Sequence, residues 1–166
     1  MDFTFHALAG AAISKELTGK YLIEASIFSI LPDVGAIPYK YFKAMSCSKK
    51  SLGRFLKDFT MPNKNGNFFG NLDKLVYRST HSLFSLIPIG LLAFIVSRSY
   101  WWILVLSYIS HFIIDAFTHE KEFSQMPLYP LLNWSIKGKG WSVNKKVFIL
   151  SWAGLIFALL LQQGIS

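Results

Sequence analysis

Two kinds of residue are scarce in this chain of 166 residues: cysteine and residues with a charged side chain. The single cysteine, Cys47, excludes a disulfide within the chain and a zinc site built from cysteines. Charged residues make up 16% of the chain, against about 25% in soluble domains. Hydrophobic residues make up 52%, and the mean hydropathy is +0.38. This composition is typical of an integral membrane protein.

Acidic residues are scarcer than basic ones, with 9 against 17, so the net charge is +8. Such a charge also occurs in nucleic-acid-binding proteins, but here the basic residues lie between apolar runs and do not alternate with aromatic residues on one polar face. We therefore expect no nucleic-acid partner. We also expect no cleavable signal, because "MDFTFHALAGAA" lacks a basic start and a long apolar core.

Three apolar runs, residues 83–96, 100–117 and 147–161, predict membrane-crossing helices. At about 1.5 Å per residue they are roughly 21 to 27 Å long, slightly short of a hydrocarbon core of about 30 Å, so flanking residues must contribute. Only residues 97–99 separate the first two runs. This short connection predicts an antiparallel helical hairpin, with a kink at Pro88 in its first arm.

Residues 4–31 contain two further helical patterns, separated by "KELTGK". With Gly19 as a helix C-cap, they predict a second and shorter hairpin, and one kinked helix over 4–31 remains the alternative.

Residues 39–78 form the one long polar stretch. Its first part predicts an amphipathic helix, and its Asn/Gly-rich part a loop. The sequence therefore predicts a single all-α domain over residues 1–166, a membrane-embedded bundle of four to five helices with a basic insertion at about 39–78. The apolar face of the amphipathic helix would be Leu52, Phe55, Leu56 and Phe59.

Basic residues concentrate in two loops. Residues 32–80 contain nine Lys or Arg against three acidic residues, and residues 118–147 contain five against two. The hairpin tip has Arg98 alone, and the C-terminal tail has no charge. By the positive-inside rule, both long loops face the cytoplasm, and the tip and the C-terminus face outward.

All four histidines of the chain fall in one predicted zone, at the open ends of the two hairpins. Pairing across the second hairpin places His81 beside Asp115 and one turn from His111. Pairing across the first places His6 within a turn of Asp33. His111 and Asp115, at i and i+4, share a helix face and can offer two ligands to one metal.

Imidazole and carboxylate ligands suit a divalent zinc ion, with manganese or iron as alternatives. Each residue alone has a simpler interpretation. His119, at a helix end, is more often a hydrogen-bonded interfacial residue, and Asp33 after "LP" is often a turn or cap residue. His111 and Asp115 can be a buried pair that fixes helix packing. The convergence of all four histidines favours a metal site.

Five short motifs follow one another along the chain: "HALAG" at 6–10, "LPD" at 31–33, "RSTHS" at 78–82, "HFIID" continuing to Thr118 at 111–118, and "LYP" at 128–130. In this order they resemble the membrane-bound metal-dependent hydrolases of the YdjM type, a bacterial family with a member regulated by the LexA repressor. That family is related to the zinc-dependent phospholipase C and P1 nuclease group. The resemblance covers residue 5 to about residue 135, and residues 39–75 carry no motif.

Two positions depart from the family pattern. Gly35 stands where the family often has a second acidic residue, and Tyr77 where it often has a histidine. Both changes would remove ligands of a second metal ion or weaken its site.

The resemblance implies a hydrolase of the bacterial inner membrane. Its substrate would be a phosphoester or a lipid-type molecule, and its partners would be the membrane lipids. The implied metal ligands are His6, Asp33, His81, His111 and Asp115, and His119 is an additional candidate.

A metal held in this way lowers the pKa of a coordinated water to about 7 and supplies hydroxide for phosphoester cleavage. We expect Asp33 and Asp115 to be the catalytic residues. Arg78 would hold a phosphate oxygen, although a positive-inside flank explains it equally well. Thr80 and Thr118 fit helix caps or hydrogen-bond partners of the ligands.

Two other classes of function stay open. A non-catalytic scaffold would use the metal only to join the two hairpins. A transporter would need its polar residues near the middle of the membrane, and the position at helix ends disfavours that.

Overall fold

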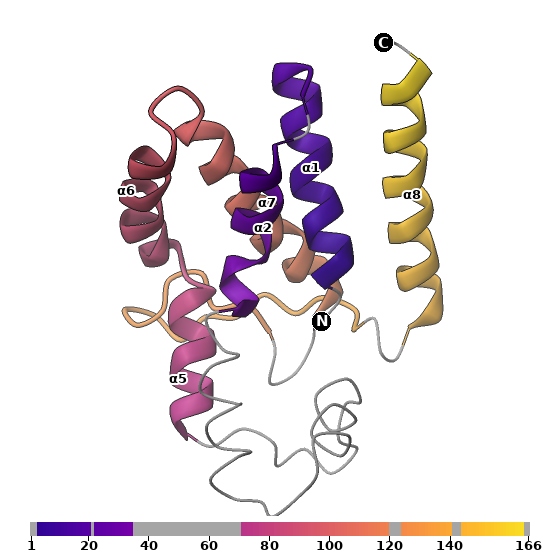
Figure 1. Ribbon diagram of the computed structural model, residues 1–166. Helices are drawn as coiled ribbons and strands as arrows, with labels where there is room; N and C mark the ends of the chain where they lie inside the picture. Colours follow the sequence, from indigo (N-terminus) through magenta and orange to yellow (C-terminus); the bar gives the residue numbers. More distant parts are fainter. Residues whose placement is uncertain (1–2, 21, 35–70, 120–123, 141–143, 165–166) are drawn as a thin grey trace, which may run out of the picture.

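The computed structural model describes residues 3–20, 22–34, 71–119, 124–140 and 144–164 (Figure 1). In this part of the chain the only β-structure is an isolated bridge between Gln125 and Ile136. The predicted all-α class is therefore confirmed. The helices are α1 (Phe3–Thr18), α2 (Ile23–Val34), α5 (Asn71–Thr80), the short 3-10 helix η1 (Leu83–Ser85), α6 (Leu86–Val96), α7 (Trp101–Thr118) and α8 (Lys145–Gly164).

The described part holds six α-helices, where the sequence predicted four to five. The additional helix is α5, whose residues 71–78 belong to the predicted polar insertion. Apolar Leu75 and Val76 among polar neighbours give it a helical pattern too short to stand out in the sequence. The amphipathic helix expected around Leu52 to Phe59, and the Asn/Gly-rich loop after it, lie outside the described residues.

The first hairpin forms as the favoured prediction described, and the single kinked helix does not. Gly19 ends α1 with a φ of +71°, and its N–H donates to the carbonyl of Lys15 at 2.8 Å. This is the left-handed conformation that glycine adopts without strain. The Ser14 hydroxyl then accepts the N–H of Leu22 at 3.0 Å, which ties the turn to α1.

Close packing holds α1 against α2. A Cβ at Gly10 would lie 2.5 Å from the carbonyl oxygen of Ala25 and 2.7 Å from Cβ of Ser29. Because lipid tails are as apolar as leucine, helices in a membrane associate through such close contacts between small residues rather than through the hydrophobic effect. Gly10 therefore sets the distance between the two helices of this hairpin.

α6 and α7 form the second predicted hairpin, but the bend of its first arm lies elsewhere. The segments Lys74–Thr80 and Leu83–Val96 meet at 63°, so the chain bends at His81 and Ser82 and not at Pro88. Pro88 lies in the first turn of α6. The N–H groups of a first turn have no intrahelical partner, so a proline there does not break the helix.

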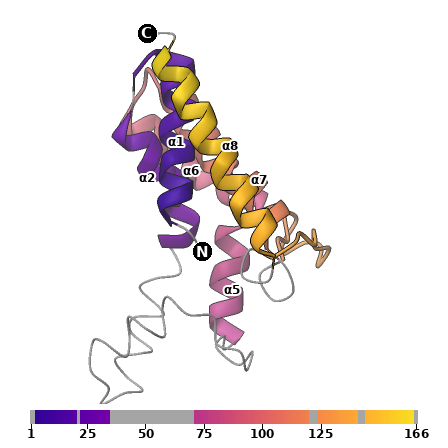
Figure 2. The same cartoon turned by 90° about the vertical axis from the view of Figure 1, so that its right-hand side faces the viewer.

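Two helices, Trp101–Thr118 and Lys145–Gln163, are long and apolar enough to cross a membrane, and the bent pair would make a third crossing. This indicates a membrane protein. In Figures 1 and 2, α1, α2 and α7 form the centre of the bundle, α6 packs on one side and α8 runs along α1 on the other. The hairpin tips and the end of α8 lie at one end of the bundle, and α5 projects from the opposite end.

Candidate metal centre

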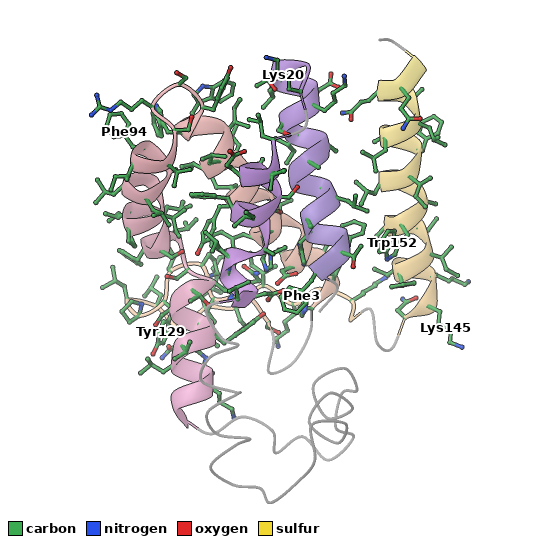
Figure 3. All side chains as sticks on the ribbon, viewed as in Figure 1. Phe3, Lys20, Phe94, Tyr129, Lys145 and Trp152 are labelled. Carbon is green, nitrogen blue, oxygen red and sulfur yellow. The ribbon has the colours of Figure 1, made fainter. Side chains whose placement is uncertain are left out.

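The predicted ligands come from four separate elements and meet at one end of the bundle. His6 lies near the start of α1, Asp33 near the end of α2, and His81 in the bend after α5. His111 and Asp115 lie in the last turns of α7. The five side chains are only 0–1% exposed. Figure 3 shows this end of the bundle, where the label Phe3 marks the start of α1.

Four ligand atoms form the centre of the cluster: Oδ1 of Asp33, Oδ2 of Asp115, and Nε2 of His81 and His111. The nitrogen of His111 lies 3.3 Å from that of His81, 3.2 Å from Asp115 and 3.6 Å from Asp33. The nitrogen of His81 lies 3.5 Å from Asp33 and 3.6 Å from Asp115. A tetrahedral ion with bonds of about 2.0–2.2 Å would hold its ligand atoms about 3.3–3.6 Å apart. The five distances lie in or close to this range, as a tetrahedral metal site requires.

Backbone carbonyls fix the tautomer of both histidines. Nδ1 of His81 lies 2.9 Å from the carbonyl oxygen of Tyr77, and Nδ1 of His111 lies 2.8 Å from that of Ser29. A carbonyl oxygen only accepts, so each Nδ1 carries the proton and donates it. In a neutral ring, Nε2 is then a bare lone pair directed into the cluster, as metal-binding histidines present it.

The two carboxylates accept no hydrogen bond of good geometry. In the described part of the chain, this holds for all four oxygens of Asp33 and Asp115. Their polar neighbours are histidine nitrogens at 3.1–3.6 Å. A buried carboxylate without compensation is costly. A divalent cation among these atoms would compensate both charges, so the residues present fit a metal ion.

His6 and His119 approach the cluster from another side. Oδ1 of Asp115 lies 3.2 Å from Nε2 of His6 and 3.1 Å from Nδ1 of His119. The His6 ring also stacks on that of His111, with centroids 3.8 Å apart. His6 thus contacts Asp115 and His111 beside the group of four, and its role as a metal ligand stays a prediction. His119 is 13% exposed and is the most open of these histidines.

Tyr77 stands where the resembled family often has a histidine, and here it supports a ligand. Its ring stacks on His81 with centroids 4.0 Å apart, and its carbonyl oxygen accepts a hydrogen bond from Nδ1 of His81. Neither this contact nor the one between His111 and the Ser29 carbonyl can be predicted from the sequence, because a backbone carbonyl leaves no signal in residue type. Gly35, the other departure, lies outside the described residues.

Two threonines lie beside histidines at helix ends. Thr80 Oγ1 donates within α5, to the carbonyls of Val76 or Tyr77 at 3.1 Å, and lies 3.0 Å from Nδ1 of His81. Thr118 Oγ1 donates to Ile114 at 2.8 Å and lies 3.2 Å from Nδ1 of His119. Each hydroxyl thus bonds within its own helix and lies beside Nδ1 of the following histidine, while the C-cap of α7 is His119.

Arg78 lies over an aromatic ring. Its Cζ is 5.9 Å from the centroid of the Tyr129 ring, a distance typical of a cation–π contact. Figure 3 shows Tyr129 beside the upper end of α5. Arg78 is therefore next to the cluster along the chain, through His81, and packs on the loop that follows α7.

Comparison with models of protein families, with characterised proteins and with solved structures gave no match. The resemblance to the YdjM type thus stays a prediction from five motifs, and a function has to be argued from the site.

Proposed function

We propose that this protein is a membrane-bound metal-dependent hydrolase, which cleaves a phosphoester or lipid-type substrate at the cytoplasmic face of the bacterial inner membrane. The observation that carries the proposal is the buried group of two carboxylates and two imidazoles, whose ligand atoms all lie within 4.8 Å of one another. Lone pairs on four atoms at such short distances repel one another unless a cation or a proton lies among them. The cytoplasmic face follows from the fourteen basic residues in the two long loops.

Zinc is the ion that we propose, with manganese or iron as alternatives, because neutral imidazole and carboxylate suit these metals. Asp33, His81, His111 and Asp115 would hold it. When bound, the ion would supply Lewis-acid chemistry and a coordinated hydroxide near neutral pH.

The two aspartates differ in what surrounds them. Asp115 contacts His111 and His81 through Oδ2, and His6 and His119 through Oδ1, so both of its oxygens are engaged. Asp33 contacts His81 and His111 through Oδ1, which leaves Oδ2 as its second buried oxygen. We infer that Asp115 organises the histidines, while Oδ2 of Asp33 accepts the proton of the attacking water as general base.

The burial of the ligands favours a second candidate function. Structural zinc sites are closed by four protein ligands, whereas catalytic sites keep one position open. With the central ligands 0–1% exposed, a metal that only joins α2, α7 and the bend after α5 would serve a non-catalytic scaffold. His119, at 13%, is the most exposed of the histidines around the cluster.

One experiment separates the two candidates. Full-length protein in nanodiscs is tested for hydrolysis of a panel of phospholipids and soluble phosphodiesters, with metal-loaded and metal-stripped samples side by side. Product formed only by the loaded sample supports the hydrolase. Loss of thermal stability on stripping, without product from any substrate, supports the scaffold.

A further inference from the structure

An open apolar groove lies beside the ligand cluster. Its volume is about 640 Å³, within the roughly 300–1,000 Å³ of typical ligand sites. Side chains from α2, the end of α5, α6 and α7 line it, together with Tyr129 and Pro130 of the loop after α7. The apolar walls are Leu31, Val34, Phe84, Pro88, Ile89 and Leu92.

Several residues that line the groove are close neighbours, in the sequence, of residues in the cluster. Leu31 and Val34 line the groove, and Asp33 lies between them in the sequence. Thr80 and Ser82 also line the groove, and they are the two sequence neighbours of His81. A bound molecule whose hydrocarbon chain lies in the groove would therefore have its other end near Asp33 and His81.

The groove is open toward the outside of the bundle. Phe84 and Leu92, which line it, are each 41% exposed. Their neighbours on α6, Ile87, Leu91 and Ile95, are 67%, 65% and 79% exposed. In a bilayer such an apolar surface contacts hydrocarbon, so a molecule enters this groove sideways from the lipid. A hydrocarbon chain meets no polar barrier there.

A cation packs on one of the residues that line the groove. The Arg78 guanidinium packs over Tyr129, and Tyr129 lines the groove. A planar guanidinium binds phosphate oxygens through two parallel hydrogen bonds. Arg78 also precedes Ser79, another lining residue, so an apolar groove with an arginine beside it matches a phosphate that carries a hydrocarbon chain.

We propose that this groove binds an acyl chain of a glycerophospholipid and that Arg78 holds the phosphate of the same molecule. This assignment rests on the proposed function, since it names the substrate class of the same site. It gives the groove a positioning role, because a chain held between α2 and α6 fixes where the phosphoester lies relative to Asp33.

The test uses full-length protein in nanodiscs that contain a trace of phosphatidylglycerol with a photoactivatable diazirine on one acyl chain. After illumination, crosslinked peptides are mapped by mass spectrometry. We expect crosslinks at Leu31 and Val34 of α2, on the inner wall of the groove. Leu92→Trp fills the groove and should reduce these α2 crosslinks about tenfold or more. Leu91→Trp, on the lipid-facing side of the same helix, should leave them unchanged.

A milder variant protects the test against misfolding. Leu92→Phe adds less volume and should give an intermediate loss, with normal elution on size-exclusion chromatography. Equal α2 crosslinking in the Leu92→Trp and Leu91→Trp proteins would overturn the proposal. Capture of an isoprenoid phosphate probe in place of the acyl probe would overturn it as well.

Crosslinking needs no turnover, so it also separates this proposal from the hydrolase. Groove crosslinks without metal-dependent hydrolysis would support the lipid site and leave the enzyme without support. Metal-dependent cleavage of a soluble phosphodiester, without groove crosslinks, would support the enzyme and overturn the lipid site.

Discussion

Nε2 of His81 and Nε2 of His111 lie 3.3 Å apart, although Nδ1 of each ring faces a backbone carbonyl. With the protons held on Nδ1, the two Nε2 lone pairs point at each other, and two carboxylate oxygens lie beside them. Two neutral imidazole rings and two carboxylates repel one another in this arrangement unless a cation or a proton lies among them. A cation at the centre would explain why the chain brings these atoms together, and the predictions below follow from this proposal.

Asp33→Asn should abolish hydrolysis while part of the metal remains bound. The amide keeps the shape of the side chain but loses the charge with which Asp33 binds metal and accepts a proton. The measurement is turnover per bound metal ion in nanodiscs. Glu24→Gln, an exposed position on the same helix, is the matched control and should retain full activity. Equal turnover in both variants would refute the role of Asp33.

Arg78→Lys should weaken turnover and leave membrane insertion normal. Lysine keeps the positive charge but loses the planar fork that holds a phosphate with two hydrogen bonds. Kinetics with a phospholipid substrate, together with membrane fractionation, would measure both effects. Arg98→Lys at the hairpin tip makes a fair control, because Arg98 also lies over an aromatic ring, 5.8 Å from the centroid of Phe94. If Arg78 is only a positive-inside flank, the two variants will behave alike.

Gly10→Ala should destabilise the protein by about 1–3 kcal/mol, because a methyl group forced into a tight contact shifts the backbone. Here the added Cβ would meet Ala25 at 2.5 Å and move α2, which carries Asp33, away from α1. The temperature of thermal unfolding in detergent and the metal content per chain should both fall. In Gly90→Ala the new Cβ has nothing within 4 Å, so stability should be unchanged or slightly higher. A tolerated Gly10→Ala would argue against close packing of the first hairpin.

The orientation in the membrane can be read by cysteine labelling of intact cells. The native Cys47 lies in the first basic loop and should be protected from an impermeant reagent added outside. Ser166→Cys in a Cys47→Ser background should be labelled, since the C-terminus is expected to face outward. Labelling of Cys47 without labelling at position 166 would reverse the proposed orientation.

The hairpins and the meeting of ligand residues could be predicted because local features determine them. Three residues between two apolar runs allow only an antiparallel pair, and Gly19 can end a helix in the left-handed conformation. These two features bring His6 toward Asp33 and His81 toward Asp115 without any knowledge of tertiary structure.

Other parts of the site depend on packing between distant segments. The bend lies at His81 and Ser82 and not at Pro88, where the sequence predicted it. The apolar pattern of α5 is too short to be distinctive. The contact between Nδ1 of His111 and the Ser29 carbonyl joins residues 82 positions apart. It depends on how closely α2 approaches α7, which no local residue pattern encodes.

Metal content per chain tests the central claim most directly. Purified wild-type protein, the His111→Ala/Asp115→Ala double variant and an Ile113→Ala control, exposed on the same helix, are equilibrated with zinc, desalted and measured by mass spectrometry of the metal. Because loss of a mere outer hydrogen-bond partner costs about 10–100-fold in metal affinity, removing two ligands should cost more. We expect a bound ion in the wild type and the control, and none in the double variant. Equal metal content in all three proteins would contradict the metal site.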